Sequence, residues 1–266
     1  MNREVVVTAV NMIDHLAPVP AGLAAGLRRA DDFIRMAVTA AHGALFGLDQ
    51  LEPERTGIFL GTAYGPLETN FESLASLIDD GEGHISPTLF SHSVFNSAAG
   101  YVGRLLNLQG PALTITDYGW PFLAALEEGR VAVASGRVAR AVVLGVETYS
   151  ELLADAYCRA HGVVAVPWRK AAVAWVLAAA ETQVGVRLEE VTVCGATSDP
   201  ADCLTRLGEV WGGLPSSHDP LHPLSHALVM TEVMAASDQV VSGPLAWELT
   251  SPFGTAIIRL KVAPQD

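Results

Sequence analysis

Continuous apolar runs alternate along the chain with stretches in which apolar side chains recur every three or four residues. The first pattern is typical of strands buried on both faces, and the second of amphipathic helices. The apolar runs predict strands at residues 4–10, 56–65, 111–117 and 139–147. The periodic stretches predict helices at residues 31–48, 67–79, 93–108 and 121–136. This alternation predicts an α/β fold in which helices cover a parallel sheet.

After about residue 170 the alternation gives way to consecutive strands. Residues 171–181 and 188–198 predict two adjacent strands, followed by a helix at 223–237 and a last strand at 255–262. No low-complexity linker separates this part from the rest, and no period of 20–50 residues recurs. We therefore expect one continuous domain over residues 1–266.

Composition excludes several classes of protein. The 29 acidic and 16 basic residues give a net charge of −13, which repels phosphate backbones and anionic lipid. No window approaches the roughly 18 uninterrupted apolar residues of a membrane span, and the first residues lack the pattern of a signal peptide. We expect a cytoplasmic protein that binds neither nucleic acid nor a membrane.

Histidine and cysteine offer little sign of a metal centre. His218, His222 and His226 lie within nine residues, but the prolines between them favour a polar loop over convergent ligands. The three cysteines, at 158, 194 and 203, have neither metal-ligand spacing nor the even number of a disulfide framework. A dyad of Cys158 with His161 is conceivable, but incidental cysteine is the better interpretation. We expect no metal.

Two glycine-flanked turns follow predicted strands. The glycines of residues 61–66 match no phosphate-binding fingerprint and favour a tight turn that exposes Tyr64. The second turn, at Asp117, Tyr118, Gly119 and Trp120, is an elbow between a strand and a helix, and it carries no serine or cysteine. Asp117 leaves two interpretations open: a group facing a ligand at the carboxyl ends of the strands, or a cap on the next helix.

Three segments, read in order, resemble the N-terminal half of β-ketoacyl synthases. They are GIFLGTAYGPLETNFESL, ISPTLFSHSVFNSAAGYVGRLLNLQGPALTITDYG and LEEGRVAVASGRVARAVVLGVE, and the match covers about residues 56–150. A weaker match continues into residues 171–199. The resemblance implies a thiolase-like layered fold with a complete N-terminal lobe (1–165) and a shortened C-terminal lobe (166–266). It also implies dimerisation through Leu113, Thr114, Ile115 and Thr116.

The departures from the family pattern concern its catalytic residues. Gly119 falls at the position of the acyl-accepting cysteine, and glycine has no side chain to acylate. The family's His-Gly-Thr-Gly-Thr segment is absent, and Asp219 stands at the likely position of its lysine. Residues 251–260 resemble a shortened version of the family's oxyanion loop. The joint loss implies no condensing chemistry and no catalytic residue in this chain.

The resemblance is strongest to the chain-length factors of type II polyketide synthases, in particular the short forms of polyene and highly reducing systems. It implies a non-catalytic subunit that pairs with an active ketosynthase (an acyltransferase), as a heterodimer or a dimer of heterodimers, and controls chain length. The chain would need no cofactor, because the carrier protein presents the phosphopantetheine-bound acyl chain to the partner. An acidic carrier is expected to dock mainly on that partner.

The same resemblance suggests which residues reach the partner's acyl tunnel. Tyr64 matches a gating position; Leu89, Ser93 and Val94 match positions that line the neighbour's channel; Asp117 and Tyr118 lie beside the interface strand. Two other interpretations stay open: a degenerate ketosynthase relative that hydrolyses or decarboxylates thioesters, with Asp117 as base, and a self-associating scaffold. The register of residues 200–222 and any role of His222 or His226 stay undetermined.

Overall fold

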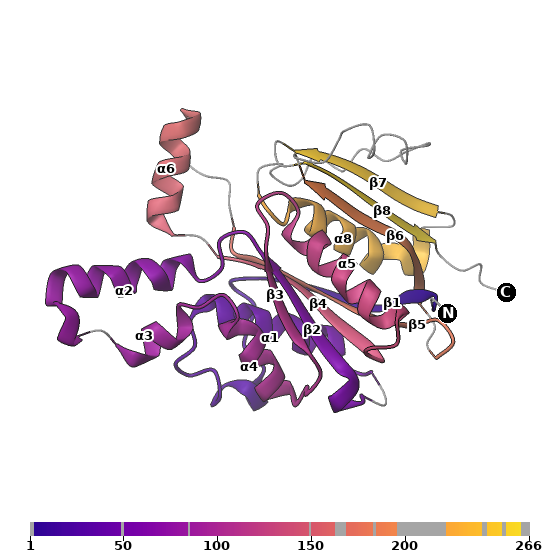
Figure 1. Cartoon of the computed structure of the whole chain (residues 1–266), viewed down its shortest axis with the longest axis horizontal. Coiled ribbons are helices and arrows are strands. Elements are labelled where there is room, and N and C mark those ends of the chain that lie inside the picture. Colours follow the sequence, from indigo (N-terminus) through magenta and orange to yellow (C-terminus); the bar gives the residue numbers. More distant parts are fainter. Residues whose placement is uncertain are drawn as a thin grey trace.

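The computed structural model describes residues 3–48, 51–84, 86–148, 150–162, 169–182, 185–195, 222–240, 244–251 and 254–261 (Figure 1). The strands are β1 (Val5–Asp14), β2 (Thr56–Thr62), β3 (Ala112–Thr116), β4 (Arg140–Glu147), β5 (Ala171–Ala179), β6 (Val186–Gly195), β7 (Pro244–Ser251) and β8 (Gly254–Lys261). The α-helices are α1 (Asp32–Leu45), α2 (Leu67–Asp80), α3 (Pro87–His92), α4 (Ser97–Leu106), α5 (Pro121–Ala134), α6 (Glu151–His161) and α8 (Ser225–Val240). Short 3-10 turns occur at Ala21–Leu23, Pro53–Arg55 and Glu82–His84.

The described strands form one mixed sheet in the order β3-β2-β4-β5-β1-β6-β8-β7. β2 is parallel to β3 and β4, as predicted. β5 runs antiparallel to both β4 and β1, so the four strands β1 to β4 all run in one direction. β5 lies between β4 and β1, so strands from both sides of residue 165 share this part of the sheet. The strands predicted at 171–181 and 188–198 were expected to be adjacent, but β1 separates β5 from β6.

The sheet has two parts joined by a narrow link. β1 and β6 pair at only two positions, Val6 with Arg187 and Val7 with Val186. Beyond this link β6, β8 and β7 form an antiparallel ladder. The first five strands and this shorter group of three give the thiolase-like fold, with an abbreviated second half among the described residues.

Two hydrophobic cores set the layers. α1 and α4 cover one face of the first five strands, with Phe33, Ile34 and Val102 in that core. α5 and α8 lie on the opposite face, between the strands and the β6-β8-β7 group (Figure 1). Trp175 on β5 and Met230 on α8 are buried in this second core. α5, which follows the elbow, is therefore packed on both sides.

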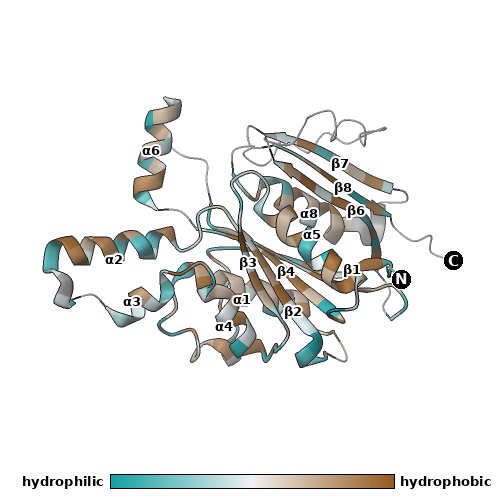
Figure 2. Ribbon diagram, viewed as in Figure 1, coloured by the Kyte–Doolittle hydropathy of each residue, from teal (hydrophilic) through white to brown (hydrophobic). Residues whose placement is uncertain are grey.

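Two helices project from these layers. α2 and α6 extend away from the body, and Figure 2 shows hydrophobic residues along both. α2, all of which the structure describes, buries only Thr69. No described helix is long and apolar enough to cross a membrane.

The elbow depends on a close approach between β2 and α5. A Cβ atom added at Gly61 would lie 1.8 Å from the backbone oxygen of Pro121, the first residue of α5. Backbone atoms cannot yield as a flexible side chain does. Gly61 thus sets the distance between β2 and the start of α5.

We expect Gly61→Ala to destabilise the fold by at least about 1–3 kcal/mol, the usual range for overpacking. The measurement is the urea midpoint of unfolding. Gly100→Ala is the matched control, because that position on α4 has no atom within 4 Å of an added Cβ and alanine favours a helix. Equal midpoints for Gly61→Ala and the wild type would contradict the close approach.

Candidate functional site

The elbow between β3 and α5 is held by the carboxylate of Asp117. Its Oδ1 accepts hydrogen bonds from the backbone N–H of Gly119 at 2.7 Å and of Trp120 at 2.6 Å. Its own N–H donates to the Thr62 carbonyl at 3.2 Å, which continues the pairing of β3 with β2. These bonds hold the turn that precedes α5 but do not cap the helix, which begins after Trp120 without a side-chain cap.

A second carboxyl group, that of Glu147, is buried behind the elbow at the end of β4. Its side chain accepts hydrogen bonds from the Thr62 hydroxyl at 3.1 Å, the Ala63 N–H, and the Tyr64 N–H at 3.2 Å. Glu147 is only 2% exposed. Burial raises its pKa to about 8, although the hydrogen bonds from Ala63, Tyr64 and Thr62 act in the opposite direction. Glu147 therefore fixes the loop that follows β2.

Three predicted site segments meet at this loop. The rings of Tyr64 and Tyr118 lie 6.2 Å apart between centroids, with Tyr118 60% exposed. Burial, and then the neighbouring Glu147 and Tyr118, raise the pKa of Tyr64. Gly65 has a positive φ of 56°, and a Cβ there would lie 2.6 Å from the Phe95 ring. The loops after β2 and β3 thus contact each other and the turn after α3.

The predicted channel residues lie in α3 and directly after it. Ser86 caps this helix by accepting from the Leu89 N–H, and the Ser93 hydroxyl donates to the Phe90 carbonyl at 2.8 Å. Leu89 and Ser93 are half-buried, whereas Val94 is exposed.

The predicted interface residues lie on a sheet edge. Among the described strands, β3 is hydrogen-bonded only to β2. Leu113 and Thr116 are exposed, while Thr114 and Ile115 are half-buried. An open, apolar strand edge invites pairing with another chain.

Large exposed apolar side chains occur on α2, on α3 and the turn after it, on β3, at the elbow, and on α6. We call this set the apolar face: Leu74, Ile78, Phe90, Val94, Phe95, Leu113, Tyr118 and Leu152. Exposed apolar surface of this kind is characteristic of a protein–protein contact.

The residue after Gly119 is buried against α8. Trp120 is 4% exposed and packs edge-to-face on His226 of α8, with ring centroids 4.8 Å apart. Burial lowers the pKa of His226 to about 4, so its imidazole is neutral at physiological pH. The indole N–H of Trp120 is buried, and within the described residues it has no hydrogen-bond partner. The elbow is thus joined to α8 by a contact between an indole and a neutral imidazole.

The other histidines and cysteines show no catalytic grouping. Nδ1 of His222 accepts from the Leu224 N–H at 3.0 Å, so the proton is on Nε2, which donates to the Arg169 carbonyl at 2.9 Å. Within the described part of the chain, Cys158 and Cys194 form no disulfide bond. His218, Asp219 and Cys203 lie outside the described residues. In the part of the chain that is described, no three His, Cys, Asp or Glu residues are placed to hold a metal ion.

Sequence reasoning missed Glu147, Trp120 and His226 as parts of one site. Glu147 could have been found, because it ends the apolar run VVLGVE as Asp117 ends TITD, and an acid at the end of a buried strand needs partners. The contact between Trp120 and His226 joins residues more than a hundred positions apart. No local pattern predicts such a pair.

A family model, described as the N-terminal domain of β-ketoacyl synthase, matches residues 7–168. This is more than half of the sequence, and the chain belongs to that family. A comparison with curated proteins finds no significant sequence match.

Solved structures with the same fold include several ketosynthase assemblies. The ishigamide ketosynthase/chain length factor aligns with a TM-score of 0.78 at 17% identity, over 98% of this chain and 100% of that chain. AntDE:AntF, a type II PKS acyl-carrier protein in complex with its ketosynthase bound to the hexaketide, gives 0.80 at 14%, over 99% and 100%. The ketosynthase ApeO in complex with its chain length factor ApeC from Xenorhabdus doucetiae gives 0.63 at 15%, over 97% and 99%. At these identities the likeness establishes the fold.

The buried Glu147 should make the stability of the chain depend on pH. In the folded state it keeps its proton up to about pH 8, whereas the unfolded chain releases it near 4.5. The free energy of unfolding should therefore fall as pH rises between 6.5 and 8, by on the order of 2 kcal/mol. His226 acts in the opposite sense, but its contribution is complete above its unfolded pKa of 6.5.

Urea unfolding at several pH values from 6.5 to 8 measures this slope. Glu147→Gln keeps the shape and cannot ionise, so its slope should be close to flat. A slope that is the same in Glu147→Gln and the wild type would contradict the assignment to Glu147.

Proposed function

We propose that this chain is a catalytically silent chain-length factor that pairs with an active ketosynthase and forms part of the wall of its acyl tunnel. The observation that carries the proposal is an elbow of the synthase fold with glycine at position 119. Nearby are the exposed apolar residues of the elbow and of β3, which is an edge strand among the described strands. Glycine has no side chain to acylate, so no acyl-enzyme can form at this elbow. The exposed edge and face instead suit a partner.

Chain length in this proposal is limited by volume. Tyr64, Leu89, Ser93 and Val94 stand at or near the apolar face, and Tyr64 is steadied through its backbone by Glu147. One methylene in an apolar pocket is worth only about 1–3 kcal/mol, so a sharp limit needs a steric stop. Asp117 contributes by holding the elbow, which presents Tyr118 to the partner's pocket.

The partner supplies the remaining chemistry. We propose that the ketosynthase carries the acylated cysteine and that the carrier protein docks mainly on it, because this chain is strongly acidic. The chain itself then needs no cofactor. A polyene product and a cytoplasmic location belong to the same proposal. The ishigamide and ApeO–ApeC structures, which contain chain length factors, support it through their fold.

A degenerate enzyme is the second candidate, since the family fold is retained. Hydrolysis or decarboxylation would need a base, and the carboxyl groups of Asp117 and Glu147 lie in this region. Asp117 Oδ1 is already engaged by two backbone N–H groups, and Glu147 is buried. Turnover of a malonyl or acyl thioester by the chain alone would favour this candidate.

The apolar face can be tested by adding a charge to it. Leu113→Asp should abolish recovery of a 1:1 complex when the chain is co-expressed with the ketosynthase encoded beside it, because a carboxylate would be buried in the contact. The complex is measured by size exclusion with light scattering. Phe46→Asp, at the exposed end of α1, is the control and should leave the complex intact. Equal recovery with both variants would count against β3 as the interface.

The tunnel role can be tested through the side-chain volume of Tyr64. Tyr64→Ala should lengthen the product of the reconstituted pair by at least one extension unit, because the steric stop is removed. Tyr64→Phe keeps the ring and should leave the length distribution unchanged. Products are measured by mass spectrometry. Unaltered lengths in Tyr64→Ala would remove Tyr64 from the account.

A further inference from the structure

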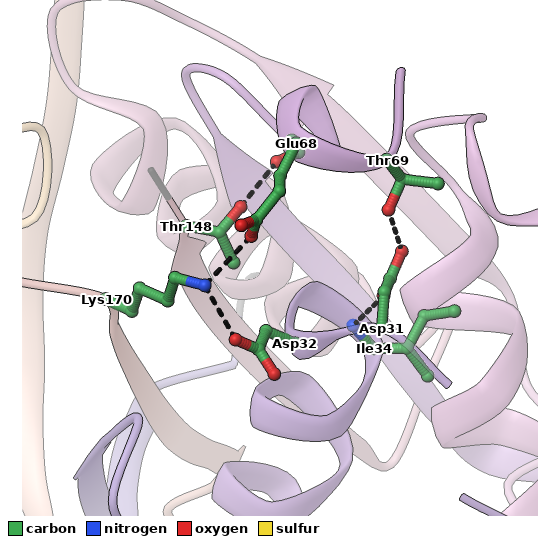
Figure 3. A network of polar contacts seen from close by, with 8 residues as sticks. Asp31, Asp32, Ile34, Glu68, Thr69, Thr148 and Lys170 are labelled. Carbon is green, nitrogen blue, oxygen red and sulfur yellow. Dashed lines mark hydrogen bonds and ion pairs between the residues drawn. The ribbon is translucent and has the colours of Figure 1, made fainter. Parts of the chain in front are cut away.

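The projecting helix α2 is fastened to the body at its base by two polar links. Nζ of Lys170 lies 2.7 Å from Asp32 Oδ2 and 2.8 Å from Glu68 Oε2 (Figure 3). Beside it, the Thr69 hydroxyl donates to Asp31 Oδ2 at 2.6 Å. Two adjacent acids at the start of α1 thus hold two adjacent residues in the first turn of α2, one of them through the lysine.

The body side of this link is rigid. Asp31 caps α1 by accepting from the Ile34 N–H at 2.9 Å, and α1 is packed into a hydrophobic core. Lys170 immediately precedes β5, all of whose residues are buried. The link therefore joins α1, α2 and β5, which lie far apart in sequence.

Beyond this link, α2 packs on the short elements that follow it, α3 and the 3-10 turn at Glu82–His84. Only Thr69 of this helix is buried, and the helix begins after Pro66 without a side-chain cap. Leu74 and Ile78, on the outer part of α2, belong to the apolar face. A helix of 14 residues is about 21 Å long, so a tilt of about 10° at the base would move its far end by about 4 Å.

The surroundings of Lys170 keep its side chain positively charged. Its side chain is 15% exposed. Burial by itself would lower its pKa, but the bonds to Asp32 and Glu68 outweigh burial and raise it, so the ammonium stays charged at physiological pH. Without that charge, Asp32 and Glu68 would face each other next to Asp31, and like charges would push α2 away from α1.

We propose that Lys170 is a positioning residue that sets the orientation of α2 and thereby the fit of the apolar face to the ketosynthase. This inference rests on the proposed function. It assigns control of the partner contact to a residue that lies outside the contact itself. The fold of the body does not require it, because the core of α1 and β5 is formed by apolar side chains.

The test compares Lys170→Met, which keeps the length without the charge, with Lys170→Arg, which keeps the charge. In co-purified complexes, Lys170→Met should raise the dissociation rate about tenfold or more, equivalent to about 1.4 kcal/mol. Lys170→Arg should restore most of the loss. Arg187→Met removes an exposed ion pair with Glu4 and is the control, with an unchanged rate.

Hydrogen exchange of the amides of α2 gives an independent readout in the same samples. Lys170→Met should speed exchange in α2 relative to α5, while the urea midpoint changes little. This inference alone is overturned if the wild-type chain forms the complex and Lys170→Met changes neither the dissociation rate nor the hydrogen exchange of α2. Failure of the wild-type chain to form any complex would overturn the proposed function as well.

Discussion

The carboxyl group of Glu147 is the contact on which the site depends. It ends β4 and accepts hydrogen bonds from the last residue of β2 and from the first two residues of the following loop. The loop leads directly into α2 and carries Tyr64. A buried polar group with this many partners tolerates little displacement, because leaving any donor unpaired is costly. The position of Tyr64, the contact of Tyr64 with Tyr118 and the start of α2 all follow from it.

In the same region, the backbone of the elbow is firmly held, but position 119 has no reactive side chain. Asp117 holds the turn, Gly61 allows α5 to approach β2, and α5 is packed on both faces. Position 119 nevertheless carries only a hydrogen atom, and the next residue, Trp120, packs on His226 of α8. A rigid elbow without a nucleophile is useful if another polypeptide binds to it. The proposed function assigns that binding to the apolar face.

Much of the fold was predictable from the sequence, because buried strands such as β2 and β4 are uninterrupted apolar runs. The direction of β5 was not, since a strand buried on both faces has the same pattern whichever way it runs. The predicted helix at 93–108 proved to be shorter, because α4 begins only at Ser97, after the turn around Val94 and Phe95. α3, α6 and β7 were not predicted.

The sequence predicted site residues only where a polar or aromatic residue lies at or just after the end of a predicted strand. Tyr64 and Tyr118, both assigned from the family resemblance, lie together. Lys170 lies 138 positions from Asp32 and 102 positions from Glu68, and the sequence contains no signal for this link. Contacts of this kind depend on the three-dimensional packing of α1, α2 and β5, which periodicity does not specify.

The central claim is that this chain lines a tunnel whose acylated cysteine belongs to another polypeptide. The most direct measurement is photocrosslinking with an acyl chain that carries a terminal diazirine, loaded on the carrier protein and transferred to the ketosynthase cysteine. Peptide mass spectrometry then locates the label after irradiation. The account predicts label on this chain at Tyr64 or within residues 89–94, and only when the ketosynthase is present. Label confined to the ketosynthase, or label on this chain without a partner, would contradict it.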